Sequence, residues 1–127
     1  MERISEIFVV LENQPSTLGD LCSHLAENGI NIEAIGVFQD TAKLYMKNIN
    51  KVMKILNKLN YVTEMRDVLR VELENRPGAL AEMVSKLGNK GINVEYCYGA
   101  LNRKKDTASV IIDVSDIDKA LKILKRK

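Results

Sequence analysis

Two asparagines lie at the two ends of one stretch of the chain, and their amides suit a small ligand that carries a positive and a negative charge. Asn75 opens segment 75–78, which reads NRPG, and Asn93 closes segment 91–93, which reads GIN. An amide both donates and accepts hydrogen bonds, so these side chains could hold the ammonium and carboxylate of a free amino acid. Unpaired N–H groups at a helix start attract a carboxylate, and Gly78 would let it come close. The pattern indicates a binding module rather than an enzyme.

A purely structural interpretation of the same residues stays open. An asparagine before a helix is a common cap, and an asparagine after a glycine is a common turn residue. For Asn75 the two interpretations have equal weight. Both asparagines recur in the first half of the chain, as Asn13 and Asn31. This recurrence favours a ligand site in at least one half.

The recurrence belongs to a repeat of the whole pattern, in which residues 12–33 return as residues 74–95. The identical pairs are Val9 and Val71, Leu11 and Leu73, Glu12 and Glu74, Asn13 and Asn75, Pro15 and Pro77, Leu18 and Leu80, Ser23 and Ser85, Leu25 and Leu87, Gly29 and Gly91, Ile30 and Ile92, Asn31 and Asn93, and Glu33 and Glu95. A duplicated unit of roughly 60 residues follows from this spacing.

The second copy predicts two helices and three strands. Apolar residues alternate with charged ones over 68–74, and again over 91–101 and 107–114, with a polar turn at 102–106 between the last two strands. A helix is expected after Pro77, ended by Gly91, and another from Ser115 onward. The expected inward residues are Leu80, Met83, Val84 and Leu87 in the first helix, and Ile117, Ala120, Leu121 and Leu124 in the second.

The first copy predicts the same order with one further strand. We expect a strand over 4–11, a helix over 15–28, a hairpin over 30–47 that turns near 39–40, and a helix over 50–59. The expected inward residues are Leu18, Leu21, Cys22 and Leu25 in one helix, and Val52, Ile55, Leu56 and Leu59 in the other. A strand at 61–65 then runs towards 68–74 without a Gly or Pro between them, so the two could form one long bent strand.

These elements predict the α+β class, as two tandem ferredoxin-like (βαββαβ) units with antiparallel sheets and helices on one face. The expected domains are 1–66 and 67–127. The second unit lacks its last strand, which would leave a sheet edge open to pairing. We expect that edge to be covered by a strand swapped within the chain or by a second chain.

Several classes of function are disfavoured by what the sequence lacks. There is no long apolar run and no leader-like N-terminus, so we expect a cytoplasmic protein without membrane contact. One His and two separate Cys suggest free thiols and no metal site. No nucleotide-binding or catalytic motif appears, and we expect no cofactor and no enzyme activity. The net charge of +2 follows no basic stripe, so nucleic acid is not an expected partner.

The N-x-P-G-x-L run at 75–80 and the G-I-N-V run at 91–94 resemble the ACT domain, a small βαββαβ module that binds amino acids. The likeness covers nearly the whole chain, twice. It implies a ligand site between two ACT units, formed by the loop after the first strand and by the start of the second. The implied site residues are Asn75, Arg76, Pro77, Gly78, Ala79, Leu80, Asn93 and Val94 in the second copy, and Asn13, Pro15, Ser16, Thr17, Leu18, Asn31 and Ile32 in the first.

The two copies match the family unequally. The family's loop glycine is matched by Gly78, whereas the first copy has Ser16, so we expect the second copy to carry the better loop. Ser16 and Thr17 could still cap the helix or contact a carboxylate. Serine-sensing members have a histidine where this chain has Leu73 and Leu11, which favours a more apolar ligand.

The leading expectation is therefore a regulatory sensor that binds an amino acid or related metabolite, forms a homodimer, and controls an enzyme or regulator of amino-acid metabolism. The alternative is a regulatory subunit that acts through protein contacts and has no ligand of its own. RNA-recognition domains share this order of elements, but they stack bases on strand aromatics. Tyr96 and Tyr98 more simply line the sheet face away from the helices, or an interface.

Overall fold

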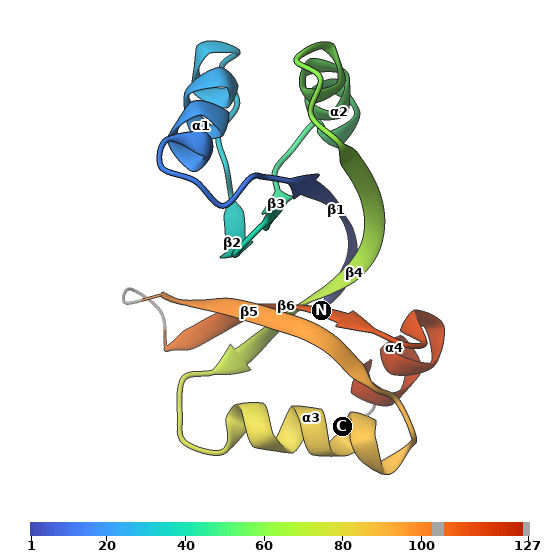
Figure 1. Ribbon diagram of the computed structural model, residues 1–127. Coiled ribbons are helices and arrows are strands. Elements are labelled where there is room, and N and C mark those ends of the chain that lie inside the picture. Colours follow the sequence, from blue (N-terminus) through green and yellow to red (C-terminus); the bar gives the residue numbers. More distant parts are fainter. Residues whose placement is uncertain (103–105, 126–127) are drawn as a thin grey trace. The chain divides into compact units, whose positions relative to one another are not determined.

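The computed structural model describes the backbone of residues 1–102 and 106–125 and the side chains of residues 1–99 and 106–125. The described elements are β1 (Glu2–Val10), α1 (Thr17–Glu27), β2 (Ala34–Phe38), β3 (Thr41–Tyr45), α2 (Ile49–Lys58), β4 (Thr63–Glu74), α3 (Ala79–Asn89), β5 (Val94–Asn102), β6 (Thr107–Val114) and α4 (Ile117–Lys125). The strands are hydrogen-bonded in the order β2-β3-β1-β4-β6-β5 (Figure 1). The predicted α+β class and the doubled βαββα order are confirmed.

The chain forms two compact units. The first unit comprises residues 5–66, and the second comprises residues 1–4 together with residues 67–127. The sequence-based boundary placed residues 1–4 with the first copy. In each unit the two helices cover one face of that unit's own strands (Figure 1).

The first unit packs its helices on β1 and β3. Its turn at Gln39 and Asp40 lies where the sequence predicts it, and Gln39 has a φ of 55°. The fully covered side chains come from alternate strand positions and from one stripe of each helix, as expected for a half-buried sheet. They are Ile7, Val9, Leu11, Leu21, Leu25, Ala42, Leu44, Met46, Val52 and Leu56.

The second unit repeats this core between α3, α4 and the strands β4 and β6. Its buried members are Leu69, Val71, Met83, Leu87, Ile92, Val110, Ile112, Val114 and Ala120. The stripe prediction is wrong for Leu59, which lies just after the end of α2 and is 40% exposed, and for one position that recurs in both copies. Leu80 is 46% exposed and its counterpart Leu18 is 38% exposed. Leu80 lies about two turns before Leu87 and projects from the same side of α3, so the helical period is right. What differs is the packing at the first turn of α3, where Leu80 lines an open pocket.

The missing last strand of the second unit is supplied from within the chain. β4 is one continuous strand of 12 residues, as predicted, and its neighbour in the second unit is the start of β1. Arg3 bonds to Asp67 at 3.2 Å and to Asp118 at 3.0 Å, while Ile4 is buried. The sequence predicts that this edge is covered either by a strand swapped within the chain or by a second chain. The structure shows the first of these, because residues 1–4 of the same chain cover it.

Glycines at the end of α3 allow a matched test of local conformation. Gly91 has a φ of 77°, in the left-handed region that costs other residues about 1–2 kcal/mol. Gly88 lies inside α3, and nothing would meet a Cβ there within 4 Å. We expect Gly91→Ala to lower the free energy of unfolding by about 1 kcal/mol and Gly88→Ala to raise it by about 0.5–1 kcal/mol. Urea unfolding of both variants checks this, and equal shifts would contradict the assigned conformation.

Candidate functional site

The loop between β4 and α3 positions the best candidate ligand groups. Gly78 caps α3 with a φ of 91°, and no side chain accepts a bond from the first turn. The Asn75 N–H donates to the carbonyl oxygen of Asp106 at 3.0 Å, which ties the loop to the β5–β6 hairpin. In the described part of the chain, the Asn75 side chain makes no hydrogen bond. The structure therefore does not bear out the capping interpretation for Asn75, because the cap residue of α3 is Gly78.

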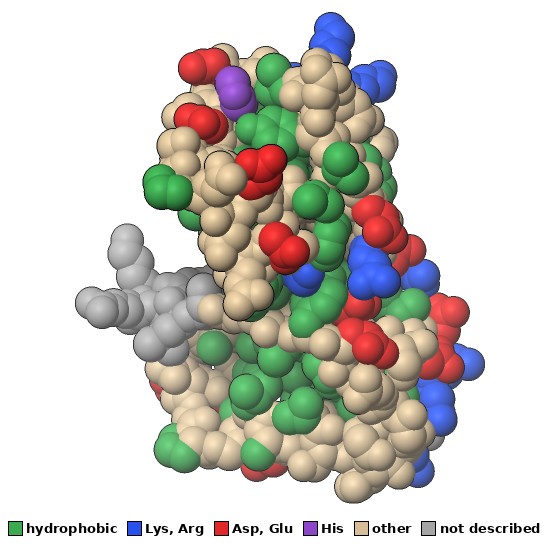
Figure 2. Space-filling model, viewed as in Figure 1, with side chains coloured by type: hydrophobic (Ala, Val, Ile, Leu, Met, Phe, Trp, Pro, Cys, Tyr) green, Lys and Arg blue, Asp and Glu red, His purple; other side chains and the backbone are tan. Residues whose placement is uncertain are grey.

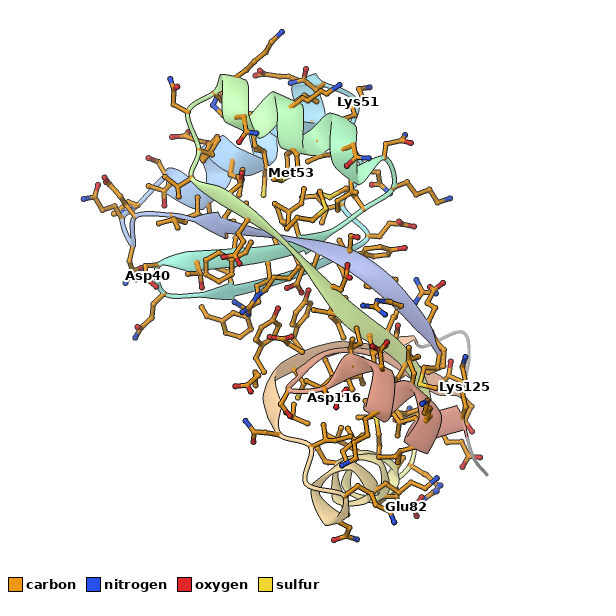
Figure 3. All side chains as sticks on the ribbon, turned by 90° about the vertical axis from the view of Figure 1, so that its right-hand side faces the viewer. Asp40, Lys51, Met53, Glu82, Asp116 and Lys125 are labelled. Atoms are coloured by element: carbon orange, nitrogen blue, oxygen red, sulfur yellow. The ribbon has the colours of Figure 1, made fainter. Side chains whose placement is uncertain are left out.

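Arg76 is held in this loop by two carboxylates. Its Nε donates to Glu74 at 2.7 Å, and its two terminal nitrogens donate to the Glu82 carboxylate at 3.1 Å and 2.7 Å (Figure 3 labels Glu82 on α3). The hydrogen bonds from Arg76, followed by its charge, lower the pKa of Glu82, and the same contacts raise the pKa of Arg76. This two-pronged geometry is the one that a free carboxylate would also adopt on a guanidinium.

A pH dependence follows from this pair. The folded pKa of Glu82 lies below its ordinary value of 4.5, so its stabilising contribution is present above that value and is lost as pH falls through the folded pKa. Because both side chains are exposed, we expect only a small effect on the melting temperature. Glu82→Gln should remove this acid-side dependence and speed hydrogen exchange in residues 75–78. Unchanged exchange in this loop at neutral pH would contradict a holding role for Glu82.

An open groove lies beside the loop on the helix-facing side of the second unit's strands. Its volume is about 430 Å³. It is lined by Leu73, Glu74, Asn75, Arg76, Ala79, Leu80, Cys97, Tyr98, Gly99, Ala108 and Val110. Figure 2 shows hydrophobic side chains gathered over the second unit between β5 and α3. The groove thus joins an apolar wall to a charged and amide-bearing end.

The structure does not bring Asn75 and Asn93 together within the repeat. Glu74 pairs with Thr107, which pairs with Asn102, whereas Val94 pairs with Val114. β4 and β5 therefore run parallel, and the end of one lies at the far end of the sheet from the start of the other. Asn75 and Asn93, whose amides were expected to hold one ligand together, therefore cannot do so inside a single repeat.

The start of β5 is tied to the segment before α4 instead. The Asn93 N–H donates to Ser115 Oγ at 3.0 Å, and the Ser115 N–H donates to the Asn93 carbonyl at 2.9 Å. Val94 is half-buried against the core of the second unit. The Asn93 amide makes no hydrogen bond among the described residues, so it remains free at that end of the sheet.

The first copy arranges its loop differently. Ser16 caps α1 with a φ of 77° and makes no side-chain cap bond, while Thr17 Oγ1 donates to the carbonyls of Glu12 at 2.7 Å and Gln14 at 3.1 Å. The hydroxyl that could have met a ligand is therefore used to close the loop. The other predicted residues of this loop are exposed: Asn13, Pro15 and Leu18.

The far end of the first unit holds the remaining predicted residues. Asn31 lines a polar pocket of about 310 Å³ together with Glu33, Lys47 and Asn48. Ile32 is half-buried against the core. As in the second copy, the strand register separates this end from the loop after β1, because Val10 pairs with Thr41 and Ala34 pairs with Tyr45.

Seven residues that line the groove are absent from the predicted site, namely Leu73, Glu74, Cys97, Tyr98, Gly99, Ala108 and Val110. The sequence alone gives no signal for Cys97 and Gly99, because their side of the sheet follows from pairing between strands. Cys97 pairs with the buried Ile112, and Gly99 pairs with the buried Val110. These pairs place positions 97 and 99 on the helix-facing side.

Other kinds of site find no support in the described residues. No group of three or more His, Cys, Asp or Glu side chains could hold a metal ion there. Both cysteines are free. Among the described helices, none has both the length and the apolar character that a membrane crossing requires.

Comparisons with known proteins bear on these features. Protein BT0572 from Bacteroides thetaiotaomicron is 28% identical, with a TM-score of 0.87 over 97% of this chain and 87% of that chain. The regulatory subunit of aspartate kinase from Thermus thermophilus, in its ligand-free form, is 20% identical, with a TM-score of 0.68 over 99% and 97% of the two chains. The corresponding subunit from Thermus flavus is 19% identical, with a TM-score of 0.70 over 98% and 90%. No curated protein matches the chain.

The family comparison is more direct than these likenesses of fold. A family model described as an ACT domain pair matches residues 2–127. ACT domains are regulatory, amino-acid-binding domains rather than catalytic ones. The doubled βαββα order, the glycine-capped loop and the family match agree, and the chain belongs to the ACT domain pair family.

Proposed function

We propose that this chain is a sensor that binds a free amino acid or a related metabolite and thereby controls an enzyme or regulator of amino-acid metabolism. The observation that carries the proposal is the loop of the second unit, where Asn75 and Arg76 lie at one end of an apolar groove. Regulatory subunits of aspartate kinase share the fold, which suggests an enzyme as the controlled partner. The protein itself has no catalytic role in this proposal.

The chemistry of the loop suits the two charged groups of an amino acid. The ligand carboxylate binds the N–H groups of the first turn of α3, which have no acceptor within the helix, and takes the place of Glu82 on the Arg76 guanidinium. The ligand ammonium binds Glu74 and the Asn75 amide oxygen. Both charges are then met at one end of the groove, which leaves the ligand side chain to lie along the apolar wall.

A second wall containing Asn93 or Asn31 would have to come from another repeat, since the strand register separates the two ends of one unit. In this proposal a second copy of the chain supplies it, and the protein acts as a homodimer. The outermost strands in the hydrogen-bonded order are β2 and β5, and such edges pair readily. Sedimentation with and without the ligand tests this part, and a monomer in both states would refute it.

The binding proposal is tested by titrating the purified chain with each of the twenty amino acids. A ligand at 100 times its dissociation constant should stabilise the folded state by about 2.7 kcal/mol, visible as a higher melting temperature. Asn75→Ala should weaken this effect, whereas Asn13→Ala, the equivalent change in the closed loop, should not. The absence of any heat or thermal shift with all twenty would contradict the proposal.

The controlled partner is sought separately. Pull-down from cell extract should recover an enzyme in an amount that changes when the ligand is added, because a ligand shifts only states that bind it unequally. Recovery of a partner that ignores every amino acid would instead favour the alternative, an interaction subunit without its own ligand.

A further inference from the structure

The two copies differ at two equivalent positions that line the groove of the second unit. Cys97 in β5 corresponds to Ile35 in β2, and Gly99 corresponds to Val37. Cys97 pairs with Ile112 as Ile35 pairs with Leu44, which confirms the equivalence in the register. The first unit thus has two branched side chains at the place where the second has a thiol and a bare backbone.

The partner strand compensates for only part of this difference. Val37 pairs with Ala42, whereas Gly99 pairs with Val110, so the bulk has moved from the edge strand to the inner strand. A Cβ at position 99 would lie 3.0 Å from the Ser109 carbonyl oxygen and 3.2 Å from a methyl group of Val110. The edge strand β5 therefore carries only small side chains at these two positions, next to the first turn of α3.

The wall of this space is apolar and incompletely covered. Leu80 is 46% exposed although its direction on α3 is that of the buried Leu87. Ala79 stands where the first copy has Thr17, so no hydroxyl faces the groove at that position. An uncovered apolar surface of this kind gains free energy when a ligand's hydrocarbon removes it from water.

We propose that this groove selects amino acids with a sizeable apolar side chain, that Cys97 and Gly99 set its size limit, and that the first unit has no equivalent site. The inference rests on the proposed function, since it assigns the ligand class of the same loop. The charged end, with Arg76 and Glu74, fits the ligand's carboxylate and ammonium. Ile35 and Val37 stand at the corresponding register positions of the first unit, where their bulkier side chains are 42% and 40% exposed. The chain accordingly binds one such ligand.

Calorimetry on the full chain with leucine, isoleucine, phenylalanine, alanine, serine, lysine and aspartate tests the selectivity. We expect the three large apolar amino acids to bind at least tenfold more tightly than serine, lysine or aspartate, with alanine between the two groups and a stoichiometry of one per chain. Equal or tighter binding of the polar amino acids would overturn the inference while leaving the sensor function standing. If none of the seven binds but another amino acid does, the selectivity inference is overturned and the sensor function still stands. If none of the twenty amino acids binds, the sensor function itself is refuted.

Substitutions that copy one unit into the other test the assigned residues. Cys97→Ile, which gives the second unit the residue of the first, should weaken leucine binding at least tenfold and alanine binding much less. Gly99→Ala should also weaken leucine binding, but it should strain β5 as well. The melting temperature of this variant is therefore measured together with its leucine affinity. Ile35→Cys in the first unit is the matched control and should leave leucine affinity unchanged. Full leucine affinity in Cys97→Ile, with the fold intact by circular dichroism, would show that this groove is not where the side chain binds.

Discussion

Replacing Leu87 by alanine is expected to lower the free energy of unfolding by about 2–5 kcal/mol, because the side chain is fully buried in the core of the second unit. Collapse around the cavity can recover only part of the lost contact, since α3 and β4 are both held by further core residues. Urea denaturation of the full chain measures the loss.

The matched control lies on the same side of the same helix. Leu80→Ala removes an equal number of atoms, but Leu80 is nearly half exposed, so we expect a loss of less than about 1 kcal/mol. The same variant should weaken binding of an apolar amino acid, because Leu80 lines the groove. Similar stability losses in the two variants would mean that the first turn of α3 is packed in solution.

Replacing Ile4 by alanine is the second change for which a large effect is expected, about 2–4 kcal/mol. Ile4 is buried and belongs to the strand segment that completes the second unit rather than the first. Hydrogen exchange should therefore quicken at Leu69, Val71 and the adjoining amides of β6, which lie in the second unit, before it quickens in β3.

Val10→Ala is the control at the other end of the same strand. Val10 is 46% exposed and its N–H donates to the Val62 carbonyl in the first unit, a bond that alanine keeps. We expect a change of no more than about 0.5 kcal/mol. If Ile4→Ala destabilised only residues 5–66, the assignment of the swapped strand would be refuted.

Local rules predicted most of the elements. Alternation located the strands, and glycine marked the end of each first helix, where Gly29 and Gly91 both have positive φ. Polar residues marked the start of α4, where Asp116 accepts a bond from the Lys119 N–H at 3.0 Å. These features depend on neighbouring residues, so a single sequence contains them.

The arrangement of the candidate site was less accessible from the sequence. Strands joined by a crossover helix run parallel, which separates Asn75 from Asn93 although they flank one helix. Periodicity gives the direction of Leu80 but not what lies beneath it. That depends on pairing across β5 and β6, and register between strands is a long-range property. The groove residues Cys97 and Gly99 could therefore be recognised only once the pairing was known.

The swapped start of β1 also has a consequence for the order of folding. Residues 5–66 contain every strand of their own unit, whereas the second unit also needs residues 1–4, which lie far from the rest of that unit along the chain. The bond between Arg3 and Asp118 joins positions 115 apart, and such distant closures are slow because the chain entropy is lost before contacts compensate for it. The first unit is thus expected to fold before residues 1–4 pair with the strands of the second unit. The unit with the open groove is therefore expected to be completed last, so a ligand present during refolding would act on the final step.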